Sequence, residues 1–256
     1  MWGLIPAAGR GSRIQPLAFS KELLPVGSRP ADGTERPCAV SEYLVDRMIA
    51  GGADKLCFVI APGKSDIMEY FGEGVPEAAA AYIVQPKPLG LCDALFRARH
   101  FIRADEQVLV GLPDTIWFPL DGFNALPADG LSFLLFPVPN PCVFDAVALD
   151  ANGGVIGIDV KSPTPRSHWV WGAFKLTGSV LAELHDLWLE RGRRDEYIGT
   201  LVNAWIALGG RAVGMQAGQT YVDVGTFEGY RTAIALLGGA QGRDLARTVS
   251  TKGSST

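Results

Sequence analysis

The sequence predicts an α/β fold: a Rossmann-like mixed, mostly parallel sheet flanked by helices, with an added antiparallel portion. Three observations support this. Short apolar runs alternate with helical patterns through the first half, a glycine-rich loop follows the first apolar run, and closely spaced strands with a hairpin turn fill the middle. Alternating strands and helices imply parallel strands joined by crossovers, with ligands at the carboxyl ends of the strands.

The first half supplies the parallel strands. The run at 2–5 predicts the first strand, and the polar, Pro- and Gly-rich segment 28–37 predicts a loop. Apolar residues at helical spacing predict a helix over 39–50, ended by Gly51-Gly52. We expect further strands over 55–61, 81–84 and 107–112. We also expect a helix over 65–71, with Ser65 as its N-cap, and a helix that follows Leu91 and runs through Phe101.

The second half begins with antiparallel material. Strands are predicted over 131–138, 146–149, 155–160 and 169–176, with Asn152-Gly153-Gly154 as a hairpin turn. There follow predicted helices over 180–191 and 197–208, strands over 211–216 and 221–224, and a helix over 226–237. We interpret 1–240 as a single domain. The polar segment 241–256 has few apolar residues and is predicted to be a disordered tail.

The composition excludes several classes of function. A net charge of −4 and a pI near 5.4 argue against a general nucleic-acid binder. No apolar run approaches the ~20 residues of a membrane span, and the N-terminus does not resemble a signal peptide. We therefore expect a cytoplasmic protein without nucleic-acid or membrane partners. The four cysteines form no Cys-x-x-Cys pair and the three histidines no ligand spacing, so neither a zinc site nor a histidine metal site is predicted.

The loop Ala7-Ala8-Gly9-Arg10-Gly11-Ser12 ends on Arg13. Glycine allows positive φ and a close approach to a ligand, and successive backbone N–H groups can cradle an anion. Arg13 and Lys21 add fixed positive charge. The loop is not a dinucleotide fingerprint, because Ile14 occupies the place of the third glycine, and it is not a P-loop. Taken alone, it suits a phosphate site and a plain tight turn equally well.

The complete pattern is more specific. Gly9-x-Gly11-Ser12-Arg13, Pro16 and Lys21-Glu22-Leu23-Leu24-Pro25 together resemble the signature of the sugar-1-phosphate nucleotidyltransferases. The Lys-Glu-Leu-Leu-Pro-Val form is most similar to bacterial UTP–glucose-1-phosphate uridylyltransferases, with the thymidylyltransferases as close relatives. The resemblance spans Gly3 to about Leu237. It implies that the phosphates are bound by Arg13 and Lys21 and the nucleoside triphosphate is held by Ala8, Gly9, Gly11 and Ser12.

Two aspartates far apart in the sequence end or follow apolar strands. Asp114 lies in Leu-Pro-Asp-Thr, and Asp223 lies in Val-Asp-Val-Gly-Thr, where Thr226 would cap the next helix. A lone aspartate in such a place is commonly a turn residue or a helix cap. The resemblance implies instead that Asp114 and Asp223 together bind Mg²⁺, which prefers carboxylates and substrate phosphates.

The remaining motifs concern the base and the acceptor. By resemblance, Gln85 and Gly90 read a pyrimidine, although Pro-x-Gly is also an ordinary helix-start turn. Lys161 would hold the acceptor phosphate and Gly172 would lie beside the sugar. Two positions depart from the family: Val160 replaces a glutamate that contacts sugar hydroxyls, and Asp145 replaces a sugar-contacting glycine.

These departures put the sugar, rather than the chemistry, in question. Segment 28–37, an apparent insertion, could add a wall to the acceptor pocket, with a plain solvent loop as the alternative. The expected reaction joins an NTP, UTP or dTTP, to a sugar-1-phosphate, giving an NDP-sugar and pyrophosphate. Two alternatives remain: a transferase acting on another phosphorylated acceptor, and a silent nucleotide-sugar-binding regulator. The oligomeric state, homo-oligomer included, stays open. The catalytic residues would be Arg13, Lys21, Asp114, Lys161 and Asp223.

Overall fold

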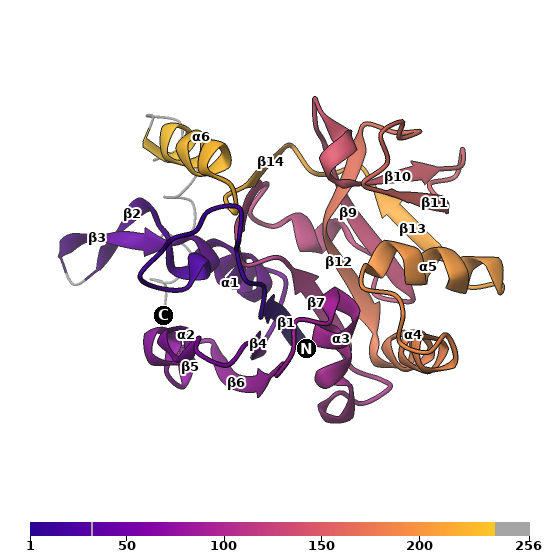
Figure 1. The fold of residues 1–256 in the computed structure, drawn as a ribbon, viewed down its shortest axis with the longest axis horizontal. Helices are drawn as coiled ribbons and strands as arrows, with labels where there is room; N and C mark the ends of the chain where they lie inside the picture. The colour runs from indigo at the N-terminus through magenta and orange to yellow at the C-terminus, as the bar shows by residue number, and fades with distance from the viewer. Residues whose placement is uncertain (32, 239–256) are drawn as a thin grey trace, which may run out of the picture.

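A ten-stranded mixed sheet forms the centre of the computed structural model, which describes residues 1–31 and 33–238 (Figure 1). Its parallel part has the order β7-β1-β4-β6. These strands are β1 (Trp2–Ala7), β4 (Lys55–Ile60), β6 (Ala78–Val84) and β7 (Gln107–Gly111), and the short β5 (Gly74–Val75) pairs antiparallel with β6. The predicted mixed α/β class is confirmed.

The antiparallel part continues the same sheet through β12 (Trp169–Thr177), which pairs antiparallel with β7. Beyond β12 lie β10 (Asp145–Leu149) and β11 (Val155–Val160), joined by the predicted hairpin turn. The strand β9 (Leu131–Pro137) also pairs with β12 and carries β13 (Ala212–Met215) in parallel. The predicted strands of this region are therefore confirmed.

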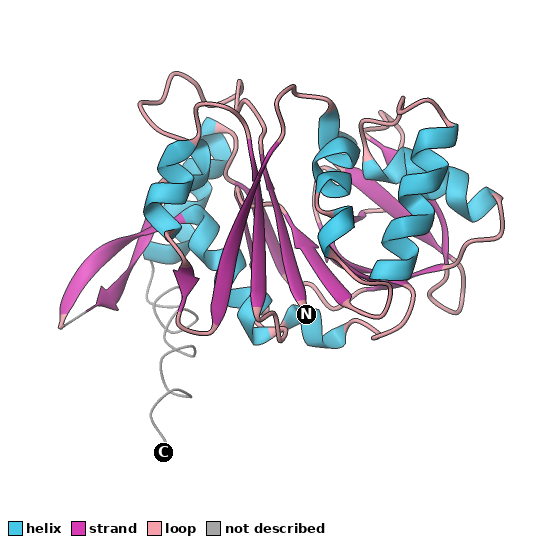
Figure 2. Ribbon diagram, turned by 90° about the horizontal axis from the view of Figure 1, so that it is seen from below, coloured by secondary structure: helices cyan, strands magenta, loops and turns pink. Residues whose placement is uncertain are grey.

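Helices cover both faces of the sheet (Figure 2). One apolar core packs α3, α4 and α5 against the sheet, and a second packs α1 and α2 against the other face. The helices are α1 (Val40–Ala50), α2 (Ser65–Phe71), α3 (Gly90–Arg97), α4 (Gly178–Glu190), α5 (Ile198–Ala207) and α6 (Phe227–Gly238); the 3₁₀ turns are η1 (Lys21–Leu23), η2 (Arg99–Phe101), η3 (Gly122–Ala125) and η4 (Pro141–Val143).

Of the two helix caps predicted from the sequence, one is confirmed and one is wrong. Thr226 caps α6 as expected, since its Oγ1 accepts a hydrogen bond from Gly229 N at 3.0 Å. The prediction that Ser65 caps α2 is wrong, because the cap position is Lys64 and its side chain makes no capping bond. The predicted tail 241–256 lies outside the described residues.

Segment 28–37 is a β-hairpin, so the predicted loop is wrong. It contains most of β2 (Pro25–Ala31) and β3 (Thr34–Ala39), which pair only with each other. An isolated two-stranded ribbon tolerates proline because it leaves many N–H groups unpaired. Two arginines tie the ribbon to α1: Arg29 donates to Asp46 at 2.8 Å, and Arg36 donates to Glu42 at 2.8 Å.

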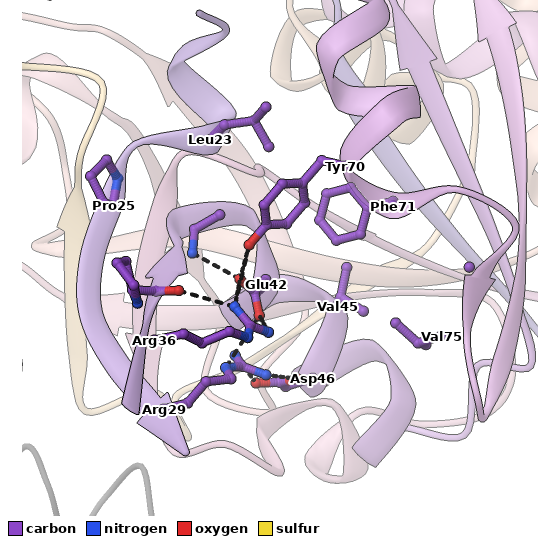
Figure 3. Close-up of a pocket in the computed structure, with 13 residues that line it drawn as sticks. Leu23, Pro25, Arg29, Arg36, Glu42, Val45, Asp46, Tyr70, Phe71 and Val75 are labelled. Atoms are coloured by element: carbon purple, nitrogen blue, oxygen red, sulfur yellow. Dashed lines mark hydrogen bonds and ion pairs between the residues drawn. The ribbon is translucent and has the colours of Figure 1, made fainter. Parts of the chain in front are cut away.

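The hairpin encloses a pocket of about 590 Å³ against α1 and α2 (Figure 3). Glu42 lies at its centre and accepts hydrogen bonds from Arg36, from Tyr70 Oη and from Ala39 N. None of the predicted site residues lines this pocket. The hairpin and the strands β10 and β11 lie at opposite ends of the molecule (Figure 1). The hypothesis that the insertion walls the acceptor pocket is therefore wrong.

A short strand that the sequence analysis missed, β8 (Thr115–Phe118), pairs antiparallel with β14 (Thr220–Asp223) in a separate two-stranded sheet. All four residues of β8 are buried. Within the described residues, no helix is long and apolar enough to cross a membrane.

Candidate active site

The β8–β14 pair brings the two predicted aspartates together. Asp223 lies opposite Thr115 in the register, and Val224 N donates to Asp114 O at 2.8 Å. Gly225 marks the point that both carboxylates face. A Cβ atom added to Gly225 would lie 2.6 Å from Asp114 Oδ2 and 2.9 Å from Asp223 Oδ1. The absence of a side chain at position 225 therefore lets both carboxylates approach the backbone closely.

Two cations from the N-terminal segment reach these carboxylates. Lys21 Nζ forms a short hydrogen bond with Asp114 Oδ2, and Arg13 Nη1 donates to Asp223 Oδ2 at 2.9 Å. Lys21 is mostly buried whereas Arg13 is largely exposed. The structure thus unites Arg13, Lys21, Asp114 and Asp223 in one constellation.

The glycine loop lies directly over the Lys21 side chain. Gly11 has a φ of +66°, and a Cβ there would lie 2.8 Å from Lys21 Cδ. A Cβ at Gly9 would lie 3.8 Å from Lys21 Nζ. Glycine is therefore needed at position 11 both for its backbone conformation and for the passage of the lysine chain. Ala8 is buried beneath the loop, while Gly9 and Ser12 are exposed.

Electrostatic interactions keep both Lys21 and Asp114 charged. Burial of Lys21 acts to lower its pKa, but Asp114, Glu22 and Asp223 outweigh burial and raise the pKa above its ordinary value. Burial of Asp114 acts to raise its pKa, but the Lys21 charge and hydrogen bond, helped by Arg13, hold it below the usual range. At neutral pH the site therefore holds an ammonium facing a carboxylate.

A second buried ion pair, which the sequence analysis missed, fixes the segment that carries Lys21. Lys64 Nζ donates at 2.8 Å to each carboxylate oxygen of Glu22 and at 2.7 Å to Ala7 O, at the end of β1. Ser41 Oγ donates to Glu22 O at 2.7 Å, which attaches η1 to α1. Glu22 stood inside the quoted motif, but no sequence pattern pointed to Lys64.

The predicted base-reading segment closes onto α5. Gln85 is buried, and its Nε2 donates to Gly90 O at 3.0 Å and to Asp93 Oδ2 at 2.8 Å. Gly90 has a φ of +88°, and a Cβ there would lie 2.7 Å from the Glu196 backbone. Gln85 therefore holds the shape of the turn, and Gly90 allows it to pack against the residues that precede α5.

The predicted acceptor residues form a separate group on the antiparallel strands. Lys161 Nζ lies 3.3 Å from Tyr197 Oη, to which it donates, and 4.3 Å from the centroid of the same ring. Gly172 lies at a bulge in β12, where a Cβ would come within 2.5 Å of the Tyr221 ring. Among the described contacts, none joins Lys161 directly to the Asp114–Asp223 pair. The Tyr221 ring, which lies beside Gly172, belongs to the same strand as Asp223.

A metal site can be judged from the donor set. Within residues 1–31 and 33–238, no group of three or more His, Cys, Asp or Glu residues is arranged to hold a metal ion. The Asp114 and Asp223 carboxylates converge on Gly225. Two converging carboxylates suit Mg²⁺, which commonly takes one or two protein carboxylates and completes its shell with water and phosphate. The residues present therefore fit this ion.

A glycine loop and two cations facing a carboxylate pair, beside the strand ends of an open sheet, are the architecture of an α/β enzyme that handles phosphorylated substrates. The chain belongs to the nucleotidyl transferase family, whose model matches residues 2–238.

Relatives agree with this family, and a solved structure shares the fold. The chain is 28% identical to a glucose-1-phosphate thymidylyltransferase of Mycolicibacterium smegmatis over 89% of this chain and 79% of the relative. It is 26% identical to the thymidylyltransferase of Neisseria meningitidis over 93% and 82% of the two chains. Its fold matches a UDP-glucose pyrophosphorylase from Acinetobacter baumannii with a TM-score of 0.73, at 21% identity, over 97% and 98% of the two chains.

Gly225 offers a direct test of the carboxylate arrangement. A Gly225→Ala variant would place a methyl group within 3 Å of both aspartates, so we expect it to force them apart and to lower nucleotidyl transfer by about 10²-fold. Gly238→Ala, where a Cβ meets nothing within 4 Å, is the matched control. Activity assays with thermal unfolding would measure both, and a fully active Gly225→Ala variant would contradict the assignment.

Proposed function

We propose that the protein transfers a nucleotidyl group from an NTP, with UTP or dTTP favoured, to a sugar-1-phosphate, and releases pyrophosphate. The observation that carries this proposal is the convergence of Lys21 and Arg13 on Asp114 and Asp223 beneath the glycine loop. The names of the relatives, thymidylyltransferases and a UDP-glucose pyrophosphorylase, support the same substrate classes.

In the proposed reaction, a phosphate oxygen of the acceptor attacks the α-phosphorus in line. A new P–O bond forms while the bond to the β-phosphate oxygen breaks, so no covalent enzyme intermediate is needed. The glycine loop would bind the triphosphate through its backbone N–H groups. Arg13 and Lys21 would neutralise charge on the transferring phosphate oxygens, and Lys161 would hold the acceptor phosphate.

Asp114 and Asp223 would hold Mg²⁺ in this proposal. The ion would supply Lewis-acid stabilisation of phosphate oxygens. Lys21 and Arg13 neutralise the two carboxylates. The same side chains lie close enough to the glycine loop to serve an incoming triphosphate.

A pyrophosphate-release screen tests the function. The purified protein would be assayed in Mg²⁺ with each common NTP against a panel of sugar-1-phosphates and phosphocholine. We expect release with a uridine or thymidine nucleotide and at least one sugar-1-phosphate. Release only with phosphocholine would favour the other-acceptor alternative, and tight binding of an NDP-sugar without any release would favour a regulator.

Gln85 tests the base site. Its amide maintains the turn that ends at Gly90, so Gln85→Ala should loosen that turn and reduce the preference among UTP, dTTP and CTP by about tenfold, the effect of losing one well-made hydrogen bond. The ratio of kcat/KM values across the three nucleotides is the measurement. An unchanged ratio would remove Gln85 from base recognition.

A further inference from the structure

On the acceptor side, position 160 is a valine where the resembled family has a glutamate. The neighbouring Asp159 does not supply the missing carboxylate. Arg166 binds the Asp159 carboxylate through Nε at 3.0 Å and through Nη2 at 2.7 Å. Successive residues of a strand point to opposite faces, so Asp159 and Val160 face different sides of β11. The Asp159 charge is therefore neutralised on the face away from Val160.

Asp145 lies directly opposite Val160 in the antiparallel β10–β11 pair. Directly opposed residues share one face of a sheet. Gly199, in the first turn of α5, meets both side chains: a Cβ there would lie 2.7 Å from Val160 Cγ2 and 3.4 Å from Asp145 Oδ2. The carboxylate absent from position 160 is thus present one strand away, on the same face.

The Asp145 carboxylate has unused hydrogen-bonding capacity. The residue is 8% exposed, and Trp171 Nε1 donates to its Oδ2 at 3.3 Å. An ionised carboxylate can accept about four hydrogen bonds. Burial raises the pKa of Asp145 above its ordinary value, against opposing effects of Trp171 and Lys161. An additional donor would therefore stabilise the ionised form.

Asp145 also borders the proposed reaction site. The neighbouring Phe144 ring contacts Tyr221, with centroids 5.7 Å apart. Tyr221 lies on β14 with Asp223. The residue next to Asp145 in the sequence therefore packs against the strand that carries Asp223.

We propose that Asp145 determines acceptor specificity: its carboxylate accepts a hydrogen bond from a hydroxyl or amino group of the sugar-1-phosphate whose phosphate Lys161 holds. This role rests on the proposed nucleotidyl transfer. In this proposal the carboxylate that contacts the sugar lies on β10 instead of β11. Asp145 would therefore contact a different group of the sugar from the one that a carboxylate at position 160 would reach.

The test is a selectivity assay on purified full-length variants. Wild type, Asp145→Asn, Val160→Glu and the double variant Asp145→Gly/Val160→Glu would be assayed with glucose-, galactose-, mannose- and glucosamine-1-phosphate. We expect Asp145→Asn to raise the KM for the preferred acceptor by about tenfold or more, as for a lost charge-assisted hydrogen bond. The NTP KM should stay within about twofold, and the double variant should change which acceptor is preferred. Glucosamine-1-phosphate separates an amino donor from a hydroxyl donor.

Asp159→Asn is the matched control, because it removes a neighbouring carboxylate from the opposite face. A purely structural role of Asp145, through its bond to Trp171, would lower the melting temperature and affect all acceptors equally. Active wild type with an unchanged acceptor ratio in Asp145→Asn would overturn the specificity role alone. Wild type that turns over no sugar-1-phosphate would overturn the proposed function, and the role of Asp145 with it.

Discussion

Replacing Asp114 or Asp223 with asparagine is expected to reduce nucleotidyl transfer by about 10²–10³-fold, the usual cost of removing one preorganised electrostatic stabiliser. Asparagine keeps the shape of the side chain but removes a charged ligand for Mg²⁺. In Asp114→Asn it also leaves the buried ammonium of Lys21 without its main counter-charge. Pyrophosphate release as a function of Mg²⁺ concentration is the measurement, and each variant should require more Mg²⁺ for half-maximal rate.

Asp105→Asn is a suitable control, because the Asp105 side chain is 76% exposed and pairs with the exposed Arg103. Thermal unfolding of each variant would separate lost chemistry from lost structure. If both site variants keep near wild-type rates and the same Mg²⁺ dependence, the two aspartates do not form the metal site.

The sequence predicted that Asp114 and Asp223 lie together but not how they meet. The motifs around Asp114 and Asp223 identified both residues by resemblance. Their physical contact depends on β8, a four-residue strand directly after Asp114. A strand of four residues is too short to give a periodic signal. Its pairing partner, β14, is distant in the sequence, so only tertiary packing could define it.

For the hairpin, the amino-acid composition led to a wrong prediction of a loop. Pro30, Gly33 and Pro37 are typical of loops, yet the ribbon forms because side chains fasten it to α1. Arg29 and Asp46 are 17 residues apart, and no local pattern predicts either ion pair. The Glu22–Lys64 pair escaped prediction for the same reason. Local periodicity therefore predicted the central sheet well and the charged contacts around the site poorly.

The sequence predicted that Arg47 lies in a helix, but it did not predict what Arg47 does there. It falls on the apolar face of α1, at helical spacing with Tyr43 and Leu44, and is 1% exposed. Its Nε donates to Trp117 O at 2.7 Å, and its Nη1 donates to Tyr43 O at 2.6 Å. The guanidinium carbon also lies 5.0 Å from the Trp117 ring centroid. Burial lowers its pKa to about 10.

These contacts make Arg47 the link between α1 and β8, and through β8 to the strand that carries Asp223. Arg47→Ala would leave the buried Trp117 carbonyl without its donors and would open a large cavity. We expect the free energy of unfolding to fall by about 3–5 kcal/mol, combining cavity formation with a buried unsatisfied acceptor. Against a typical total of about 5–15 kcal/mol, this is a major loss.

Urea unfolding followed by circular dichroism would measure the change, with Arg103→Ala as a solvent-exposed control. Arg47→Lys provides a milder variant if the alanine protein does not fold. One ammonium cannot reproduce the planar guanidinium fork, so we expect a loss of about 1–3 kcal/mol. Because β8 positions β14, the folded lysine variant should also lose activity. A lysine variant with wild-type stability and rate would show that Arg47 neither holds β8 nor supports the site.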